Sequence, residues 1–290
     1  MKLSVLFLFI SLISNLTYAQ SSDSRLNGLE QEIESLIKIY NAVGLSVSIV
    51  EGSEVLYSKG FGHRDLEKKL PVNKNTAFPI ASSSKAFTAS LLGVLEFENK
   101  ISLKDKPSLY IPKMQFYTNE MDNQITIEDL LSHKSGLGNL NGTLVLFPEN
   151  DRLKIMEKLK YITPEGRVKD SWIYSNMGYT IAGTIVEQVT NETWEQNIHD
   201  KILIPLEMSS SFTDFENMKS SNNFSYGYGL SSGQIKKVLY ETLYDYSPAG
   251  GVKSTSDDLA NWMIAWLNNG KFKRETGTTR RIYQRRYNYT

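Results

Sequence analysis

The sequence predicts a mixed α/β (α+β) protein in which a short antiparallel hairpin precedes a mainly helical region. Three observations lead to this fold class. Apolar residues recur at three- and four-residue intervals over residues 26–40, as in an amphipathic helix. Two alternating, β-branched segments follow at residues 44–50 and 54–61, with the turn 51–53 between them. From residue 82 to about residue 240 the apolar spacing is mainly helical.

The composition is that of a globular protein with one large domain or two closely joined domains. The chain has 290 residues, of which 40% are hydrophobic and 22% are charged, and it contains no low-complexity tract. The formal net charge is zero, but residues 271–290 carry seven Lys or Arg against one Glu. Since no basic stripe runs through residues 20–270, nucleic acid is not an expected partner.

Residues 1–19 have the features of a secretory signal peptide. Lys2 precedes an apolar run over residues 3–16, and Thr17 and Ala19 put small residues at the −3 and −1 positions of a cleavage site. A run of 14 residues is too short for a stable membrane anchor. The chain has no Cys, which excludes disulfides and lipid attachment at a cysteine. We therefore expect an exported protein, either periplasmic or secreted.

The stretch from Phe78 to Ala89 predicts a nucleophile at the start of a buried helix. Ser82 stands near the first turn, where backbone N–H groups and the helix dipole favour a developing negative charge. Lys85 lies three residues later and projects from the same face. A partly desolvated Lys there can lose its proton and accept one from the serine hydroxyl. This is the chemistry of Ser-x-x-Lys acyl-transfer enzymes.

The Ser-x-x-Lys spacing alone leaves a second interpretation open. Ser35 and Lys38 have the same spacing inside the first helix, without a special helix start. In the alternative interpretation, Ser82 is an N-cap serine in a Ser-rich turn and Lys85 is solvated. The rest of the chain has to decide between the two.

A second conspicuous helix begins just after Tyr174 and Asn176. A turn at this place would put a phenol and an amide side by side on the Ser82 site. The alternative is a tyrosine at the edge of the core with Asn176 as a helix N-cap, and the same Tyr-x-Asn spacing occurs at residues 117–119. The core face of this helix continues over residues 181–189.

Two shorter helices are predicted from their caps. Thr126 caps a short helix that stops at residues 134–137, and His133 is interpreted as a last-turn histidine favoured by the helix dipole rather than as a catalytic base. Ser256 caps a helix over residues 257–268, which ends at a glycine.

The histidines give no indication of a metal site. His63, His133 and His199 are scattered and lack the spacing of metal ligands, so neither a metal nor a cofactor is expected.

Several segments together resemble the serine β-lactamase and penicillin-binding-protein-like family, and most closely its class C β-lactamase, DD-peptidase and esterase branch. They occur in the family's order and span about residues 30–270. The main similar segments are residues 80–89, 125–137, 174–179, 205–208 and 248–251. The resemblance implies an antiparallel sheet flanked by helices, with a largely helical region inserted between the second and third strands.

The resemblance also implies roles for individual residues. Ser82 would be the acylated nucleophile, with its backbone N–H as one half of the oxyanion hole. Lys85 would be its proton-transfer partner, Tyr174 the general base that also protonates the leaving group, and Asn176 the group that holds the substrate amide. The implied substrate is a small-molecule or peptide amide or ester: a β-lactam, a D-Ala-D-Ala peptide or a simple ester.

One segment of the family pattern is missing. The Lys-Thr-Gly or His-x-Gly strand that supplies the second oxyanion N–H has no counterpart after Gly251. Lys134-Ser135-Gly136 precedes Tyr174, and Glu275-Thr276-Gly277 has an acid in place of the cation. We therefore expect a C-terminally truncated hydrolase domain over residues 20–270 with an incomplete sheet, followed by a basic irregular tail over residues 271–290.

These expectations leave two functions. One is a secreted serine hydrolase, slow or inactive because it lacks that strand. The alternative is a truncated, non-catalytic remnant that at most binds peptide or cell-wall fragments. The sequence does not choose among the substrates and does not predict the oligomeric state.

Export is expected to remove residues 1–19, because Thr17 and Ala19 follow a short apolar core. Mass spectrometry of the exported protein should find Gln20 as the first residue. An exported protein that retains Met1 would contradict the signal-peptide interpretation.

Overall fold

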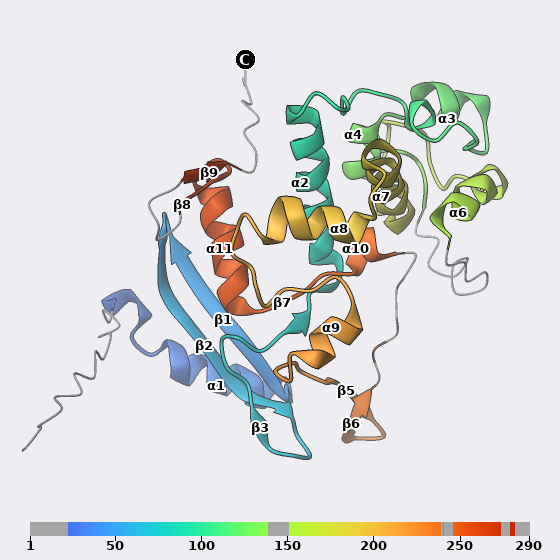
Figure 1. Ribbon diagram of the computed structural model, residues 1–290. Coiled ribbons are helices and arrows are strands. Elements are labelled where there is room, and N and C mark those ends of the chain that lie inside the picture. Colours follow the sequence, from blue (N-terminus) through green and yellow to red (C-terminus); the bar gives the residue numbers. More distant parts are fainter. Residues whose placement is uncertain (1–22, 139–150, 239, 241–245, 274–278, 282–290) are drawn as a thin grey trace, which may run out of the picture.

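The structure is a computed structural model that describes residues 23–138, 151–238, 240, 246–273 and 279–281 (Figure 1). Residues 1–22, and with them the predicted signal peptide, lie outside the described residues. The α-helices are α1 (Leu29–Ile39), α2 (Ser84–Phe97), α3 (Asn119–Gln124), α4 (Ile127–Leu131), α6 (Arg152–Lys158), α7 (Asn176–Thr190), α8 (Trp194–Ile198), α9 (Phe215–Ser220), α10 (Ser247–Gly250) and α11 (Ser256–Leu267).

Shorter helical turns and strands complete the described elements. The 3-10 turns are η1 (Ser24–Leu26), η2 (Ala81–Ser83), η3 (Pro107–Leu109) and η4 (Leu159–Tyr161), and η5 (His199–Leu203) is a π-helical turn. The strands are β1 (Gly44–Glu51), β2 (Glu54–Asp65), β3 (Leu70–Pro71), β4 (Phe78–Pro79), β5 (Gly227–Ser231), β6 (Gln234–Val238), β7 (Lys253–Ser254), β8 (Lys271–Lys273) and β9 (Thr279–Arg281).

The predicted hairpin is present as β1 and β2, which pair antiparallel from Gly44 opposite Gly62 to Glu51 opposite Glu54. β2 runs beyond its predicted end and pairs with β3, so that the described sheet has the order β1-β2-β3. Helices cover both faces of the hairpin, α1 on one and α11 on the other (Figure 1). This mixed architecture of helices and small antiparallel sheets agrees with the fold class that the sequence predicts.

The alternation of the strand residues explains how the hairpin serves two helices. Successive side chains of a strand point to opposite faces. Three alternate residues of β1, Leu45, Val47 and Ile49, pack under α1. They form one small core with Ile33, Tyr57 and Phe61. Val50, one residue past a register shift, packs instead with the main core.

The main core lies in the helical region and holds α2 and α7 together. Its fully buried side chains come mostly from these helices and from α4 and α8, among them Phe87, Leu91, Leu92, Leu95, Ile127, Leu130, Ile181, Ile185, Trp194 and Ile198. Since both long helices bury most of their length, their relative position is fixed by packing.

A short antiparallel pairing joins distant parts of the chain. Phe78 of β4 pairs with Ser254 of β7, and Pro79 pairs with Lys253. It places the residues just before α2 next to those that follow α10, and the candidate nucleophile therefore lies beside the turn at residues 247–252 (Figure 1).

Of two predicted helix caps, one is confirmed and one is shifted by one residue. Thr126 caps α4 as predicted, in a capping box with Asp129. The cap of α11 is Thr255 and not Ser256, because the Thr255 hydroxyl accepts the backbone N–H of Asp258 while Ser256 is the first helical residue.

The expectation of an irregular tail from residue 271 is wrong for its first part. Lys271–Lys273 and Thr279–Arg281 form the antiparallel pair β8–β9 beside α11 (Figure 1). Phe272 is 5% exposed and joins the main core with Ile264 and Ala265. One buried aromatic residue therefore secures a strand in a segment whose composition lacks apolar periodicity. Residues 274–278 and 282–290 lie outside the described residues.

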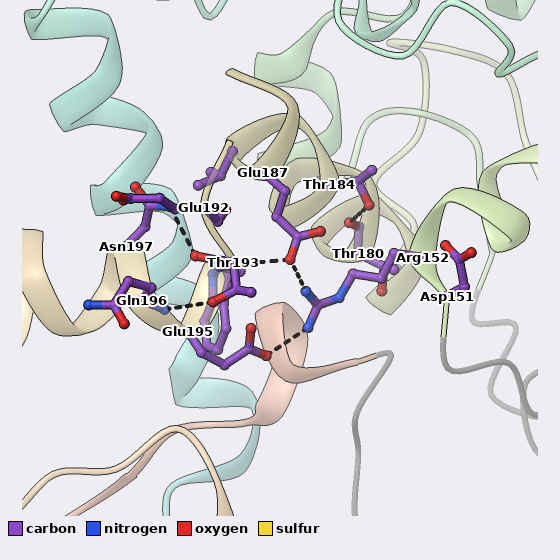
Figure 2. A network of polar contacts seen from close by, with 12 residues as sticks. Asp151, Arg152, Thr180, Thr184, Glu187, Glu192, Thr193, Glu195, Gln196 and Asn197 are labelled. Atoms are coloured by element: carbon purple, nitrogen blue, oxygen red, sulfur yellow. Dashed lines mark hydrogen bonds and ion pairs between the residues drawn. The ribbon is translucent and has the colours of Figure 1, made fainter. Parts of the chain in front are cut away.

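An ion-pair network fastens α6 to α7 and α8. Figure 2 shows the Arg152 guanidinium between Glu187 and Glu195: it contacts the Glu187 carboxylate and lies 2.8 Å from Glu195 Oε1. The same Glu187 carboxylate accepts the backbone N–H of Trp194 at 3.1 Å. Burial raises the pKa of Glu187, and Arg152 opposes this rise.

Within the described residues, no helix combines the length and the apolar character needed to cross a bilayer.

The closest approach of α7 to α10 depends on Gly183. A Cβ at this position would lie 2.2 Å from Cγ of Pro248, a rigid ring that cannot turn away. We expect Gly183→Ala to lower the free energy of unfolding by about 1–3 kcal/mol, the usual range for overpacking, although alanine favours a helix by ~1 kcal/mol. Chemical denaturation measures this difference.

Gln188→Ala is the matched control for this prediction, because Gln188 lies on the exposed face of the same helix. It should leave stability within about 0.5 kcal/mol. Equal stability of the Gly183→Ala variant and the native chain would show that Pro248 can move aside.

Candidate active site

Ser82 is exposed and lies in the 3-10 turn that leads into α2. The regular helix begins at Ser84, two residues later than the sequence suggests. Ala81 has φ at 46°, in the left-handed region that residues other than glycine seldom adopt. Such backbone conformations persist where the surrounding structure enforces them. The turn therefore presents the Ser82 hydroxyl to solvent beside a buried helix.

The structure brings three of the predicted residues together around one hydroxyl. Ser82 Oγ lies 2.7 Å from the phenolic oxygen of Tyr174, and Lys85 Nζ donates to Ser82 Oγ at 3.3 Å. Ser82 and Tyr174 are 92 residues apart in the sequence, so only the packing of α2 against α7 makes this contact. The interpretation of Lys85 as a solvated side chain is wrong, since this residue is only 6% exposed.

Two further acceptors fix the Lys85 ammonium. It donates to Oδ1 of Asn176 and to the backbone carbonyl of Ala249, at 2.7 Å each. Burial lowers the pKa of Lys85 because it penalises the charged form, while Tyr174 acts in the opposite direction. The ammonium is therefore held in place but gives up its proton more readily than a solvated lysine.

The phenol of Tyr174 is shifted toward its ionised form. Burial alone would raise its pKa, but the Lys85 ammonium and the Ser82 hydroxyl favour the phenolate and lower the pKa below its ordinary value. Lys85 Nζ also lies 4.8 Å from the centroid of the Tyr174 ring. The pKa values of Lys85 and Tyr174 are both lowered, so a proton can move among Ser82, Tyr174 and Lys85.

Asn176 occupies a position different from the one expected of an N-cap. The cap of α7 is Ser175, whose Oγ accepts the backbone N–H of Gly178 at 3.2 Å. Asn176 is the first residue of the helix, and its Oδ1 accepts from Lys85. The contact that the structure shows is therefore with the lysine; the predicted contact with a substrate amide stays a prediction.

The turn at residues 247–252 supplies a functional group that the sequence analysis missed. Thr88 Oγ1 donates to the carbonyl of Pro248 at 2.7 Å, and Ser84 Oγ accepts the backbone N–H of Val252 at 2.9 Å. These bonds hold the turn against α2 and aim the Ala249 carbonyl at Lys85. Every residue has a backbone carbonyl, so the sequence does not indicate which one faces Lys85; only the family resemblance of residues 248–251 drew attention to this segment.

A buried chain of contacts links this turn to the network in Figure 2. Trp194 is fully buried, and its indole N–H donates to Thr88 Oγ1 at 3.0 Å. The backbone N–H of Trp194 donates to Glu187, the partner of Arg152 (Figure 2). The position of Lys85 therefore depends on contacts that reach from α2 through α8 to α6.

His133 is placed differently from the prediction. It lies beyond Ser132, the C-cap of α4, and has φ at 61°. Its Nδ1 accepts the backbone N–H of Ser175 at 3.1 Å. Burial and the Lys85 charge lower the pKa of His133, whereas a helix C-terminus would raise it. The interpretation as a last-turn histidine favoured by the helix dipole is therefore wrong.

The arrangement is suited to nucleophilic attack by a serine. An exposed hydroxyl lies within hydrogen-bond distance of a phenol, and a buried ammonium lies beside both. Among the residues that the structure describes, no group of three or more His, Cys, Asp or Glu is placed to hold a metal ion.

Comparison with known proteins matches residues 29–290 to the family model described as Beta-lactamase. Protein flp of Staphylococcus aureus (strain MW2) is 29% identical over 250 residues, which are 83% of this chain and 50% of that protein. The teichoic acid D-alanine hydrolase of Staphylococcus aureus (strain MRSA252) is 30% identical over 215 residues, 74% of this chain and 52% of that protein. The chain thus spans about half the length of these curated relatives.

A solved structure shows the same fold. The octameric penicillin-binding protein homologue from Pyrococcus abyssi superposes with a TM-score of 0.73 at 27% sequence identity, covering 84% of this chain and 56% of that chain. The family model covers most of the sequence, including the hairpin, the helical region and all four predicted site residues. As the resemblance predicted, the chain belongs to the beta-lactamase family of serine hydrolases.

Proposed function

We propose that this chain is an exported serine hydrolase that forms an acyl-enzyme at Ser82. The observation that carries the proposal is the contact of 2.7 Å between Ser82 Oγ and the Tyr174 phenolic oxygen, with Lys85 Nζ 3.3 Å from the same Oγ. A nucleophile and a base in direct contact, with the base adjusted by a third group, are the structural signature of activated serine nucleophiles.

In the acylation step, the Tyr174 phenolate takes the proton of Ser82 Oγ as the oxygen attacks the carbonyl carbon of the substrate. The Lys85 ammonium stabilises the phenolate electrostatically. When the tetrahedral intermediate collapses, the bond to the leaving group breaks, and Tyr174 gives its proton to the leaving oxygen or nitrogen. The substrate acyl group remains on Ser82.

Deacylation uses the same groups in the reverse sense. Water attacks the acyl carbonyl and gives its proton to the Tyr174 phenolate. Ser82 Oγ then leaves the carbonyl carbon and takes this proton, so that the acid is released and both side chains return to their starting states. Lys85 needs no net change of protonation in the cycle, in keeping with its fixed contacts to Asn176 and Ala249.

The substrate class we propose is an ester or amide of small-molecule or cell-wall chemistry. The family relationship and the name of the teichoic acid D-alanine hydrolase, 30% identical, support D-alanyl esters and amides within this class. In this proposal Asn176 contacts the substrate amide, and the Ser82 backbone N–H stabilises the oxyanion.

Labelling with a fluorophosphonate or a fluorescent penicillin tests the assignment of Ser82. We expect the native chain to be acylated, Ser82→Ala to lose the label, and Ser83→Ala, which removes a neighbouring exposed hydroxyl, to keep it. Peptide mass mapping identifies the labelled residue. Absence of label on the native chain would favour the non-catalytic alternative. A label that is kept by Ser82→Ala but lost by Ser83→Ala would show that Ser82 is not the nucleophile.

A second test concerns Tyr174 and pH. The base form of Tyr174 exists above its lowered pKa, and the Lys85 charge is lost above the lowered pKa of the ammonium. The profile of kcat/KM should therefore rise with pH as Tyr174 ionises and fall again as Lys85 is deprotonated. Tyr174→Phe removes one hydroxyl and should cost about 100- to 10,000-fold in kcat/KM, with unchanged thermal unfolding. Near-native turnover in this variant would exclude Tyr174 as the base.

A further inference from the structure

His133 forms hydrogen bonds with the residues on both sides of Tyr174. Its backbone carbonyl accepts the N–H of Ile173 at 2.9 Å, and its ring Nδ1 accepts the N–H of Ser175 at 3.1 Å. Between these bonds the imidazole packs on the Tyr174 ring, with the ring centroids 4.8 Å apart. One residue therefore fixes the backbone before and after the phenol as well as the ring itself.

The backbone of His133 is arranged for this contact. Its φ of 61° turns the chain sharply after α4, which sends the carbonyl and the side chain toward the same neighbouring segment. The turn is held on both sides: Lys134 N donates to the carbonyl of Asp129 at 2.8 Å, and the Tyr179 hydroxyl donates to the carbonyl of Leu131 at 2.8 Å. A left-handed conformation at a non-glycine residue is costly and persists only when such contacts enforce it.

We propose that His133 is a positioning residue that holds the Tyr174 phenol on Ser82, and that it does so only as a neutral imidazole whose Nδ1 is an acceptor. The proposal rests on the function proposed above for Tyr174. Neutral imidazole has one acceptor nitrogen, but in the imidazolium ion both nitrogens are donors. Protonated His133 would therefore oppose the Ser175 N–H with an N–H of its own, and the bond would be lost.

The surroundings of the ring keep it neutral near pH 7. The titratable groups that face it are Lys85 from α2, Tyr174 itself and Tyr179 from α7. Of the two carboxylates on α4, Asp129 accepts from Thr126 and lies 3.6 Å from Lys169, and Glu128 is paired with Lys104. Burial and the Lys85 charge lower the pKa of His133, so acid below its ordinary value of about 6.5 is needed to break the contact.

Two substitutions separate the acceptor from the ring. His133→Asn puts an amide oxygen close to the place of Nδ1, removes the titration, and tolerates the left-handed backbone. His133→Phe keeps an aromatic ring but has no acceptor. Trp172→Phe is the control, because Trp172 also packs edge-on against His133, with centroids 5.5 Å apart, while the bonds from Ile173 and Ser175 remain in place.

Two measurements follow Tyr174 in each variant. Carbon-13 tyrosine NMR, with the resonance identified by its loss in Tyr174→Phe, gives the pKa of the phenol without requiring turnover. The second-order rate of Ser82 acylation by a fluorophosphonate gives the chemical consequence. Circular dichroism and thermal unfolding show that each variant is folded.

We expect His133→Phe to raise the pKa of Tyr174, because the phenol moves away from Lys85, and to slow acylation about tenfold, a part of the roughly 100- to 10,000-fold that a general base contributes. His133→Asn and Trp172→Phe should keep the pKa of Tyr174 close to that of the native chain, and at pH 8 they should also keep its rate of acylation. The rate ratio of native chain to His133→Asn should be constant above neutral pH and fall as the pH drops through the pKa of His133, since only the native chain loses its acceptor.

Unchanged Tyr174 titration and acylation in folded His133→Phe would overturn the positioning role, as would a rate ratio to His133→Asn that does not vary with pH. If His133→Phe does not fold, the pH dependence of the ratio alone decides. A native chain that is never acylated, but whose Tyr174 titration still shifts in His133→Phe, would refute the proposed function and leave the positioning role intact.

Discussion

The burial of the Lys85 ammonium is the constraint on which the rest of the site depends. The ammonium of a lysine that is only 6% exposed needs compensating acceptors, and these are Ser82, Asn176 and the carbonyl of Ala249. These acceptors come from three separate segments, the start of α2, the start of α7 and the turn at α10. The groups that compensate the buried charge are therefore the groups that form the site. A shift of any of the three segments would remove one acceptor from the lysine.

Rigid contacts around the site keep these segments in place. Gly183 lets α7 approach Pro248 closely, and Trp194 donates to Thr88, which in turn holds the Pro248 carbonyl. Strained backbone occurs at the two ends of the arrangement, at Ala81 before the nucleophile and at His133 beside the base. Such strain has to be balanced by packing elsewhere, and the main core between α2 and α7 provides that packing.

The β hairpin and the helical region contribute differently to function. The hairpin carries none of the four predicted site residues. Its covering helix α11 follows β7 directly in the chain, and β7 pairs with β4 just before the nucleophile turn. The structure adds β8 and β9 at the C-terminal side of α11, where Phe272 reaches the main core. The chain spans about half the length of the curated relatives it matches.

Local pattern determined the elements of this protein, and tertiary structure decided its chemistry. Apolar periodicity and short capping signals act over a few residues, which is why the hairpin, α2, α7 and the Thr126 cap could be predicted from the sequence. The motif around Ser82 and Lys85 also stood out, because the two residues lie one helical turn apart. The role of the Ala249 carbonyl, the contact of Asn176 with Lys85 and the bond from Ser175 to His133 could not be predicted. Each depends on the approach of segments about 40 to 160 residues apart, on backbone groups that every residue shares, and on a burial that only the packed core defines.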